Sequence, residues 1–272
     1  MSHPAEPTEL KSCCAAVYQN SFARRLLGDS FHPGGRRLTA RLGEQLGLAR
    51  GVRVLDVASG RGDSANFLAA QFGCQVVGVD LGPQNVKEAN SNAIAAQVAH
   101  LVSFVEGDAE RLDFPEAGFD AVICECSFCT FPDKRAAASE FARVLRPGGR
   151  VGMSDLTRSG PLHRDLAGLF AWIACIADAR PIEEYAGYLE AAGFDVTTIE
   201  PHNYALAEMA RDIQGRLLGA ELMVKLKKLD LPGADFEQAK QLARAAAKAI
   251  QQGLLGYSLI VAQLRAREPA CL

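Results

Sequence analysis

Residues 52–62 read Val-Arg-Val-Leu-Asp-Val-Ala-Ser-Gly-Arg-Gly: an apolar run with an acidic residue near its end, followed by a turn of small residues. The run predicts a buried strand that ends at Asp56, and residues 63–72 predict a helix after the turn. A second apolar run, residues 75–79, ends at Asp80. Because residues without bulky side chains let the backbone approach a ligand closely, this series of strand, turn, helix and strand predicts a βαβ unit whose turn binds a ligand.

The spacing between Gly60 and Asp80 indicates the class of ligand. Asp80 lies 20 positions after Gly60, at the end of the second strand, where a carboxylate can accept hydrogen bonds from both ribose hydroxyls. A glycine turn alone does not identify the ligand, because NAD enzymes share it. Here Ala58 replaces the first glycine of the dinucleotide fingerprint and Asp63 replaces its last. The sheet is therefore predicted to be Rossmann-like, with a ligand that segments further along the chain must identify.

Three further segments complete the pattern. Residues 102–106 predict a third strand, followed by Gly-Asp-Ala-Glu, and residues 119–124 predict a fourth. Residues 141–150, Phe-Ala-Arg-Val-Leu-Arg-Pro-Gly-Gly-Arg, end a helix and lead into a fifth strand at 151–154. The series resembles the class I S-adenosylmethionine-dependent methyltransferases across roughly residues 40–200, the length of a domain. The resemblance implies an α/β fold, S-adenosyl-L-methionine as cofactor and S-adenosyl-L-homocysteine as product.

The resemblance also implies a role for each loop of the expected sheet. Asp80 would contact the ribose, Asp108 and Ala109 would lie beside the adenine, and the turn that ends at Gly62 would face the methionine part. Cys124, within the fourth strand, belongs to the same expected site, although a buried thiol commonly acts only as a small hydrophobe. The predicted cofactor-binding residues are Asp56, Ala58, Gly60, Gly62, Asp80, Leu81, Asp108, Ala109 and Cys124.

Composition limits the class of protein and its partners. The chain has 272 residues, of which 49% are hydrophobic, and this length suits one domain with additions. Its formal net charge is −3, so no basic field favours nucleic acid or an anionic membrane. No apolar run is long enough to cross a bilayer, and the N-terminus lacks a signal pattern. We expect a cytoplasmic protein whose eight cysteines are reduced thiols and whose partner is a small-molecule or metalloid acceptor.

The chain is expected to divide into three parts. Residues 1–48 form an N-terminal helical segment, residues 49–200 the cofactor-binding core, and residues 201–272 a helical insertion that ends in a last strand. Neither outer part is needed for the basic fold. Two interpretations stay open: these helices form a lid over cofactor and acceptor, or they cover apolar sheet or form a homodimer contact.

Cysteines near the end of the fourth strand suggest an acceptor. Cys126 follows that strand, in the loop that faces the methyl group in this fold, and Cys175 lies in a predicted helix that should cover the same edge. This arrangement resembles the arsenite methyltransferases, with Cys126 before a Pro-Asp-Lys run and Cys175 before a Gly-Phe turn. That family has a third cysteine near the N-terminus, which Cys13 or Cys14 would match. The resemblance implies three soft thiolates that hold trivalent arsenic with its lone pair toward the methyl group.

The resemblance to the arsenite enzymes is incomplete. After Glu200 that family continues with a small β-rich region, whereas this chain has helical runs at 204–228 and 235–252 before a strand at 256–263. The Gly-Glu that precedes the second cysteine in the family is absent before Cys175. These departures do not change the prediction of methyl transfer, but they leave acceptors other than arsenic open.

Other acceptors fit the same loops. A small thiol, methylated to a thioether, needs a base such as a carboxylate or His32, which precedes Pro-Gly-Gly in a loop that could cross the cofactor. Carbon or oxygen methylation of a natural product would use the helical insertion as an acceptor pocket. The alternative that is not an enzyme is a protein that binds the cofactor as a sensor, without turnover. Backbone bonding by the histidine and core packing by the cysteines are the competing interpretations. A single Cys-x-x-Cys does not predict a metal site. The candidate catalytic residues are Cys126, Cys175, Cys14 and His32.

Overall fold

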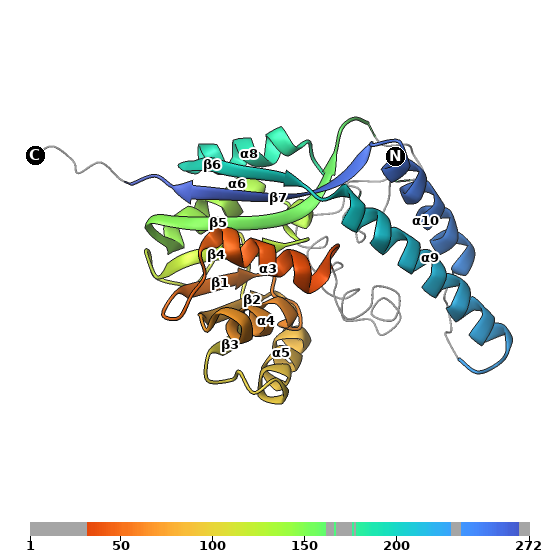
Figure 1. Cartoon of the computed structure of the whole chain (residues 1–272), viewed down its shortest axis with the longest axis horizontal. Coiled ribbons are helices and arrows are strands. Elements are labelled where there is room, and N and C mark those ends of the chain that lie inside the picture. Colours follow the sequence, from red (N-terminus) through yellow and green to blue (C-terminus); the bar gives the residue numbers. More distant parts are fainter. Residues whose placement is uncertain (1–31, 162–165, 167–175, 177, 230–234, 267–272) are drawn as a thin grey trace, which may run out of the picture.

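The computed structural model describes residues 32–161, 166, 176, 178–229 and 235–266. The strands of this part are β1 Arg53–Val57, β2 Gln75–Asp80, β3 Val102–Glu106, β4 Phe119–Glu125, β5 Leu145–Arg158, β6 Phe194–Pro201 and β7 Leu255–Leu264. Together these described strands form one seven-stranded sheet in the order β3-β2-β1-β4-β5-β7-β6 (Figure 1). Strand β7 lies antiparallel between β5 and β6, and the other pairs are parallel.

Helices cover both faces of the sheet (Figure 1). They are α3 Gly35–Leu46, α4 Asp63–Phe72, α5 Pro83–Ala95, α6 Lys134–Val144, α8 Ile182–Ala191, α9 Asn203–Lys225 and α10 Phe236–Gln251, with a short 3₁₀ helix η1 Phe128–Thr130. On one face, α3 contacts α4 and β5, and α4 contacts α5. On the other face, α6 contacts α8, which in turn contacts β6. Helices α9 and α10 pack on each other and project beyond the sheet (Figure 1).

The central strands are buried on both faces, as parallel strands between two helical layers must be. Neighbouring side chains of β1, β4 and β5 are fully covered: Val54, Leu55, Val122, Ile123, Val151 and Met153. Burying each such side chain stabilises the fold by about 1.5–3 kcal/mol. Two-sided burial is the reason that these strands appear in the sequence as continuous apolar runs.

A glycine in β5 sets the approach of α3 to the sheet. A Cβ at Gly152 would lie 2.6 Å from Cδ1 of Leu42 and 3.0 Å from Cδ1 of Leu46. Leu42 is fully covered, so its side chain has no room to yield. Helix α3 therefore packs directly on the backbone of β5, and this brings Thr39 of the same helix to the end of β4, where it bonds to Glu125.

The predicted α/β class is confirmed, with two differences in detail. Strand β5 begins at Leu145 rather than at 151, because Leu145 already pairs with Phe119 before a register shift. The predicted last strand is β7, which lies inside the sheet, so the C-terminal segment contributes to the core as well as covering it. Residues 1–31 of the predicted lid, and the segment around Cys175, lie outside the described residues.

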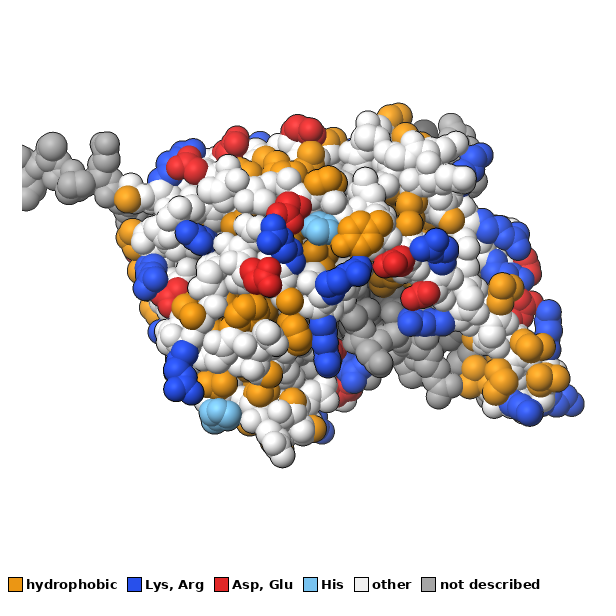
Figure 2. Space-filling model, viewed as in Figure 1, with side chains coloured by type: hydrophobic (Ala, Val, Ile, Leu, Met, Phe, Trp, Pro, Cys, Tyr) orange, Lys and Arg blue, Asp and Glu red, His pale blue; other side chains and the backbone are white. Residues whose placement is uncertain are grey.

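The surface is mixed in charge on the face that Figure 2 shows, where Lys and Arg alternate with Asp and Glu. Apolar side chains gather along and just after the end of α9, where Leu218, Leu222 and Leu226 are 59%, 56% and 56% exposed. Within the described ranges, every helix is too short or too polar to span a bilayer.

Candidate active site

A pocket opens at the carboxyl ends of β1, β2 and β4, where the strand order reverses. Open α/β sheets bind their ligands at this point, in the crevice between loops that lead to opposite faces. Seven predicted cofactor-binding residues line the pocket: Asp56, Ala58, Gly60, Asp80, Leu81, Asp108 and Ala109. His32 and Cys126, the two predicted catalytic residues that fall within the described ranges, line it as well.

The turn after β1 presents bare backbone to the pocket. Ala58 and Gly60 have φ angles of +58° and +53°, in the left-handed region that a residue with a side chain adopts at a cost of about 1–2 kcal/mol. The Ser59 N–H donates to the Val79 carbonyl at 3.0 Å, which holds the turn against β2. A Cβ at Gly60 would meet no atom within 4 Å, so the space in front of this turn is open to a ligand.

Asp80, at the end of β2, is oriented by backbone groups. Its Oδ2 accepts from the Gly60 N–H at 2.8 Å, and its Oδ1 accepts from the Gly82 N–H at 2.8 Å and from Asn85 Nδ2 at 3.1 Å. A carboxylate has about four lone-pair positions, so Asp80 keeps acceptor capacity toward ligand hydroxyls. The predicted ribose contact fits this arrangement and stays a prediction.

Asp56 brings a carboxylate oxygen to the pocket wall without a protein donor. The residue is 3% exposed, and its Oδ2 has no hydrogen-bond partner among the described residues. Burial, and then the charges of Glu125 and Asp80, raise the pKa of Asp56 well above its usual value. A buried acceptor of this kind fits a ligand that brings a cationic donor. The residues present therefore suit a ligand with positive charge near β1 and hydroxyls near β2.

Gly62 and Cys124 differ from the prediction, because neither lines the pocket. Gly62 has a φ of +79°, and a Cβ there would lie 2.4 Å from Cζ of Phe104, so glycine is needed for packing against β3. Cys124 is fully covered within β4. Burial, followed by the charges of Asp155 and Asp56, raises the pKa of the Cys124 thiol well above its usual value. The structure therefore assigns both residues to packing.

Glu125, the last residue of β4, is a pocket residue that the sequence motifs did not predict. Its side chain is 4% exposed. Its Oε2 accepts from Ser64 Oγ at 2.6 Å and from Thr39 Oγ1 at 3.1 Å, and His32 Nε2 lies 3.7 Å from the same oxygen. The available signal was an acidic residue at the carboxyl end of a parallel strand. The family resemblance rested on the neighbouring Cys126, so the prediction named that cysteine and not Glu125.

His32 contacts other groups through both ring nitrogens. Nδ1 lies 3.3 Å from the Pro33 carbonyl oxygen. Nε2 lies 3.3 Å from Thr39 Oγ1 and 3.7 Å from Glu125 Oε2. An imidazole beside a buried carboxylate is an arrangement found among general bases.

The four cysteines within the described ranges divide into one pocket residue and three buried core residues. Cys126 has a φ of +52° and its N–H donates to the Ser154 carbonyl at 2.6 Å, so its position is held by β5. Cys129, on η1, is fully covered. The other predicted arsenic ligands, Cys14 and Cys175, lie outside the described residues. In the part of the chain that the structure describes, no three His, Cys, Asp or Glu side chains form a group that could hold a metal ion.

Comparison with known proteins finds a methyltransferase family model and several named methyltransferases. A family model described as a methyltransferase domain matches residues 55–153, from β1 to β5. O-methyltransferase cnsE of Penicillium expansum is 31% identical over 234 residues, which are 84% of this chain and 78% of that protein. The 27-O-demethylrifamycin SV methyltransferase of Amycolatopsis mediterranei is 32% identical over 60% of this chain and 61% of its own. An arsenite methyltransferase of Halobacterium salinarum is 32% identical over 57% of this chain and 40% of its own.

Among solved structures, the [4+2]-cyclase SpnF has the same fold, with a TM-score of 0.75 over 98% of this chain and 100% of its own, at 20% identity. Such a likeness concerns the fold alone. The chain spans 62% and 61% of the length of two curated methyltransferase relatives, whereas its similarity to cnsE extends over most of both proteins. Because that similarity is accompanied by a methyltransferase domain match over the strands that build the pocket, the chain belongs to the class I S-adenosylmethionine-dependent methyltransferases, whose cofactor is S-adenosylmethionine.

Proposed function

We propose that this chain transfers the methyl group of S-adenosylmethionine to a hydroxyl oxygen of an uncharged small molecule. The observation that carries the proposal is the position of His32, whose Nε2 lies 3.7 Å from the buried carboxylate of Glu125 in the pocket. A neutral hydroxyl is a weak nucleophile, so its methylation needs a base. A positioned base typically contributes about 10²–10⁴-fold to the rate.

The pocket residues divide between holding the cofactor and preparing the acceptor. Asp80 and the turn at residues 58–60 would hold the nucleoside, and Asp56 would face the cationic methionine part. When bound, the cofactor supplies a methyl group on a sulfonium, an electrophile that needs orientation more than activation. His32 Nε2 accepts the hydroxyl proton, and the Glu125 carboxylate stabilises the imidazolium that forms.

The charge of the pocket disfavours an anionic acceptor. Five carboxylate residues line it: Asp56, Asp63, Asp80, Asp108 and Glu125. Among the described lining residues, Arg61 is the only Lys or Arg, and its Nε lies 3.2 Å from Glu88 Oε2. An anionic acceptor such as a phosphate ester would be repelled by these carboxylates, whereas a neutral hydroxyl compound would not.

Two relatives support oxygen as the acceptor atom. The cnsE protein, similar over 84% of this chain, is named an O-methyltransferase, and the Amycolatopsis enzyme is named for the oxygen of 27-O-demethylrifamycin SV. We extend the acceptor atom, and not the individual compounds, to this chain. A hydroxylated natural product is the acceptor class that this comparison favours.

Cys126 favours a second candidate, trivalent arsenic held by thiolates. It lines the pocket after β4, where the arsenite enzymes have a cysteine, and Cys175 and Cys14 would complete the set of ligands. The Halobacterium salinarum relative supports this candidate over 57% of the chain. Methylation of a small thiol to a thioether is a third candidate, for which His32 would generate the thiolate.

A methyl-transfer screen separates these candidates. The full chain is incubated with S-adenosylmethionine and, in turn, neutral phenols, hydroxylated natural products, arsenite and methanethiol; S-adenosylhomocysteine release is measured and the products are identified by mass spectrometry. We expect turnover of a hydroxyl compound that falls about 10²–10⁴-fold in His32→Ala and changes little in Cys126→Ser. Arsenite turnover that requires Cys126 and survives His32→Ala would establish arsenic as the acceptor instead.

A further inference from the structure

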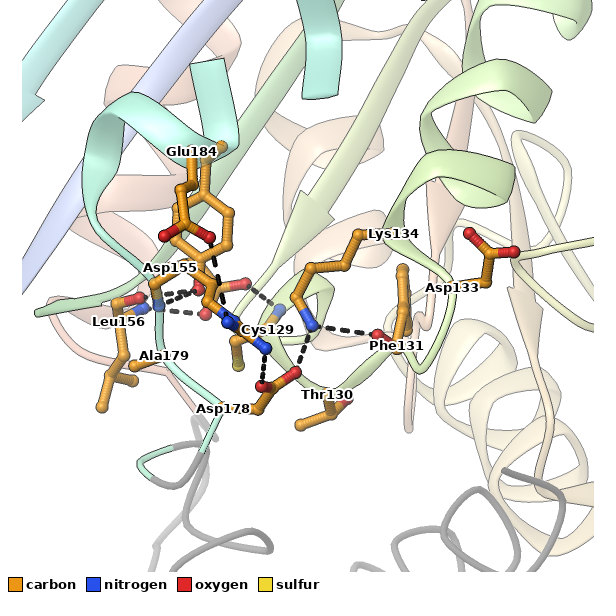
Figure 3. Close-up of polar contacts among 12 residues, drawn as sticks. Cys129, Thr130, Phe131, Asp133, Lys134, Asp155, Leu156, Asp178, Ala179 and Glu184 are labelled. Carbon is orange, nitrogen blue, oxygen red and sulfur yellow. Dashed lines mark hydrogen bonds and ion pairs between the residues drawn. The ribbon is translucent and has the colours of Figure 1, made fainter. Parts of the chain in front are cut away.

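Lys134 is a buried ammonium at the start of α6, outside the residues assigned to cofactor and acceptor. Its side chain is 4% exposed. Nζ donates to the Phe131 carbonyl oxygen at 2.9 Å and to Asp178 Oδ2 at 2.5 Å, and Figure 3 shows it between these two groups. Burying an ammonium disfavours the fold unless the charge is paired and hydrogen-bonded. The contacts of Lys134 therefore link the loop after β4 to the segment before α8.

Asp178 connects this link to anchored parts of the fold. Its Oδ1 accepts from Arg180 Nη2 at 2.5 Å, and Arg180 Nη1 lies 3.9 Å from Glu184 Oε2 on α8. The Arg180 carbonyl accepts from the N–H of Arg158, at the end of β5, at 3.1 Å. Asp178 is thus attached to α8 and to β5, and Lys134 ties the loop to both.

The loop that Lys134 holds is part of the pocket wall. Ser127, Thr130 and Phe131 line the pocket. Phe128, within the loop, is fully covered, and the Cys129 N–H donates to Asp155 Oδ2 at 2.9 Å, so this end is anchored in the core. At the other end, the carbonyl of Phe131 accepts from the ammonium and the Asp133 N–H donates to Glu110 Oε1 at 2.8 Å. The predicted cofactor residues that line the pocket lie at or just after the ends of β1, β2 and β3, whereas this wall follows β4. The wall therefore belongs to the acceptor side of the pocket.

We propose that the Lys134–Asp178 ion pair is a positioning device that holds the wall at residues 130–131 against the methyl acceptor. The inference rests on the proposed methyl transfer, because the wall matters to catalysis only if an acceptor binds beside it. Lys134 does not touch the reacting atoms and acts through the backbone of Phe131. Loss of the ion pair should therefore raise the KM of the acceptor and leave the affinity for S-adenosylmethionine unchanged.

The variants are chosen to keep the protein folded. Removing one partner alone would leave a buried unpaired charge, so the test variant combines Lys134→Met with Asp178→Asn and removes both charges. Lys134→Arg keeps the charge and tests rescue. The matched control is Lys225→Met on α9, which breaks a pair with Glu221 at 2.8 Å whose lysine is 69% exposed.

Hydrogen exchange and calorimetry test the wall without any acceptor. In the double variant we expect the backbone amides of residues 127–133 to exchange about tenfold faster, which is within the range of coupling energies between contacting residues. The exchange rate of the β1 amides should stay unchanged. Cofactor affinity should stay within about twofold of the wild-type value. Lys134→Arg, which keeps the charge, should retain the wild-type protection of these amides. Lys225→Met should change neither the exchange rates nor the cofactor affinity. Unchanged exchange at residues 127–133, or a loss of cofactor affinity as large as the gain in exchange, would overturn the proposal.

Kinetics then test the effect on the acceptor. With the compound that the methyl-transfer screen identifies, KM should rise about tenfold in the double variant while kcat changes less than about threefold. An unchanged KM in a variant with faster exchange would overturn the acceptor role. If the wild-type chain methylates none of the compounds, the proposed function fails by itself, and the exchange and calorimetry results still decide whether the ion pair orders the wall.

Discussion

Ser64 donates a hydrogen bond of 2.6 Å to Glu125 and joins the first turn of α4 to the end of β4. Thr39 of α3 donates to the same carboxylate at 3.1 Å. Ser154 of β5 donates to the other carboxylate oxygen at 3.3 Å, so three hydroxyl groups satisfy the buried charge and hold it beside His32. A buried carboxylate opposes folding unless it is hydrogen-bonded, so the arrangement fits a group that is retained for the reaction.

Glu125→Gln keeps the shape of the side chain and removes the charge beside His32. We expect kcat for a hydroxyl acceptor to fall about 10–100-fold, because a charge-assisted interaction of about 1.5–3 kcal/mol is lost. Calorimetry should show nearly unchanged affinity for S-adenosylmethionine. Glu106→Gln, at the exposed end of β3, is the control. A wild-type kcat in Glu125→Gln would remove this carboxylate from the mechanism.

Asp80→Ala should weaken binding of S-adenosylmethionine by about 1–3 kcal/mol, because charge-assisted hydrogen bonds to the ribose are lost. Asp80→Asn is the more selective change, since an amide oxygen can still accept from the Gly60 or Gly82 N–H. Isothermal titration calorimetry measures both affinities, and thermal melts without cofactor report any damage to the turn. Asp113→Ala, at an exposed position, is the control. Equal affinities in all three variants would contradict the ribose assignment.

Gly60 and Gly62 offer a matched pair of substitutions. Gly62→Ala combines a φ of +79° with a Cβ 2.4 Å from Phe104 Cζ, so urea titrations should show a loss of about 2–5 kcal/mol from strain and overpacking. Gly60→Ala meets no atom within 4 Å and should cost only about 1–2 kcal/mol. Its methyl group enters the space in front of the turn, so cofactor affinity should fall. The larger loss of stability is expected for Gly62→Ala, and the larger loss of cofactor affinity for Gly60→Ala.

Glu140 contributes a pH-dependent part of the stability. The Arg143 guanidinium, opposed by burial and assisted by the Leu112 N–H, lowers the pKa of Glu140 below its usual value. Because the folded pKa lies below the unfolded one, the interaction stabilises the protein above the unfolded pKa of about 4.3 and is lost as the pH falls through the folded pKa.

Glu140→Gln should therefore lower the free energy of unfolding by about 1 kcal/mol at pH 7, and the difference from wild type should shrink as the pH falls below the unfolded pKa of about 4.3 and through the folded pKa. Urea titrations across this range measure it, with Glu190→Gln on an exposed position of α8 as control. A difference that stays constant with pH would show that the charge of Glu140 is not its source.

Several core elements could be predicted from local signals alone. Helix α4 and strand β3 have the predicted bounds, 63–72 and 102–106, because an apolar face or run bounded by Gly or Asp marks each of them. Strand β5 shows the limit of such signals. Leu145 and Arg150 both pair with β4, across a register shift, so a segment with the composition of a turn is held in the strand by its partner.

The sequence by itself determined the fold class, the ligand-binding turn and the methyl donor, because buried parallel strands and glycine turns leave a record in the type and order of neighbouring residues. Only the tertiary structure decided which side chains surround His32, the candidate base. His32, Thr39, Ser64 and Glu125 come from four separate segments, and they meet because α3 packs on β5 and α4 on β2. Hydrogen bonds between residues from separate segments depend on packing that no local sequence pattern encodes. For that reason the sequence motifs pointed to Cys126 and not to the neighbouring carboxylate of Glu125.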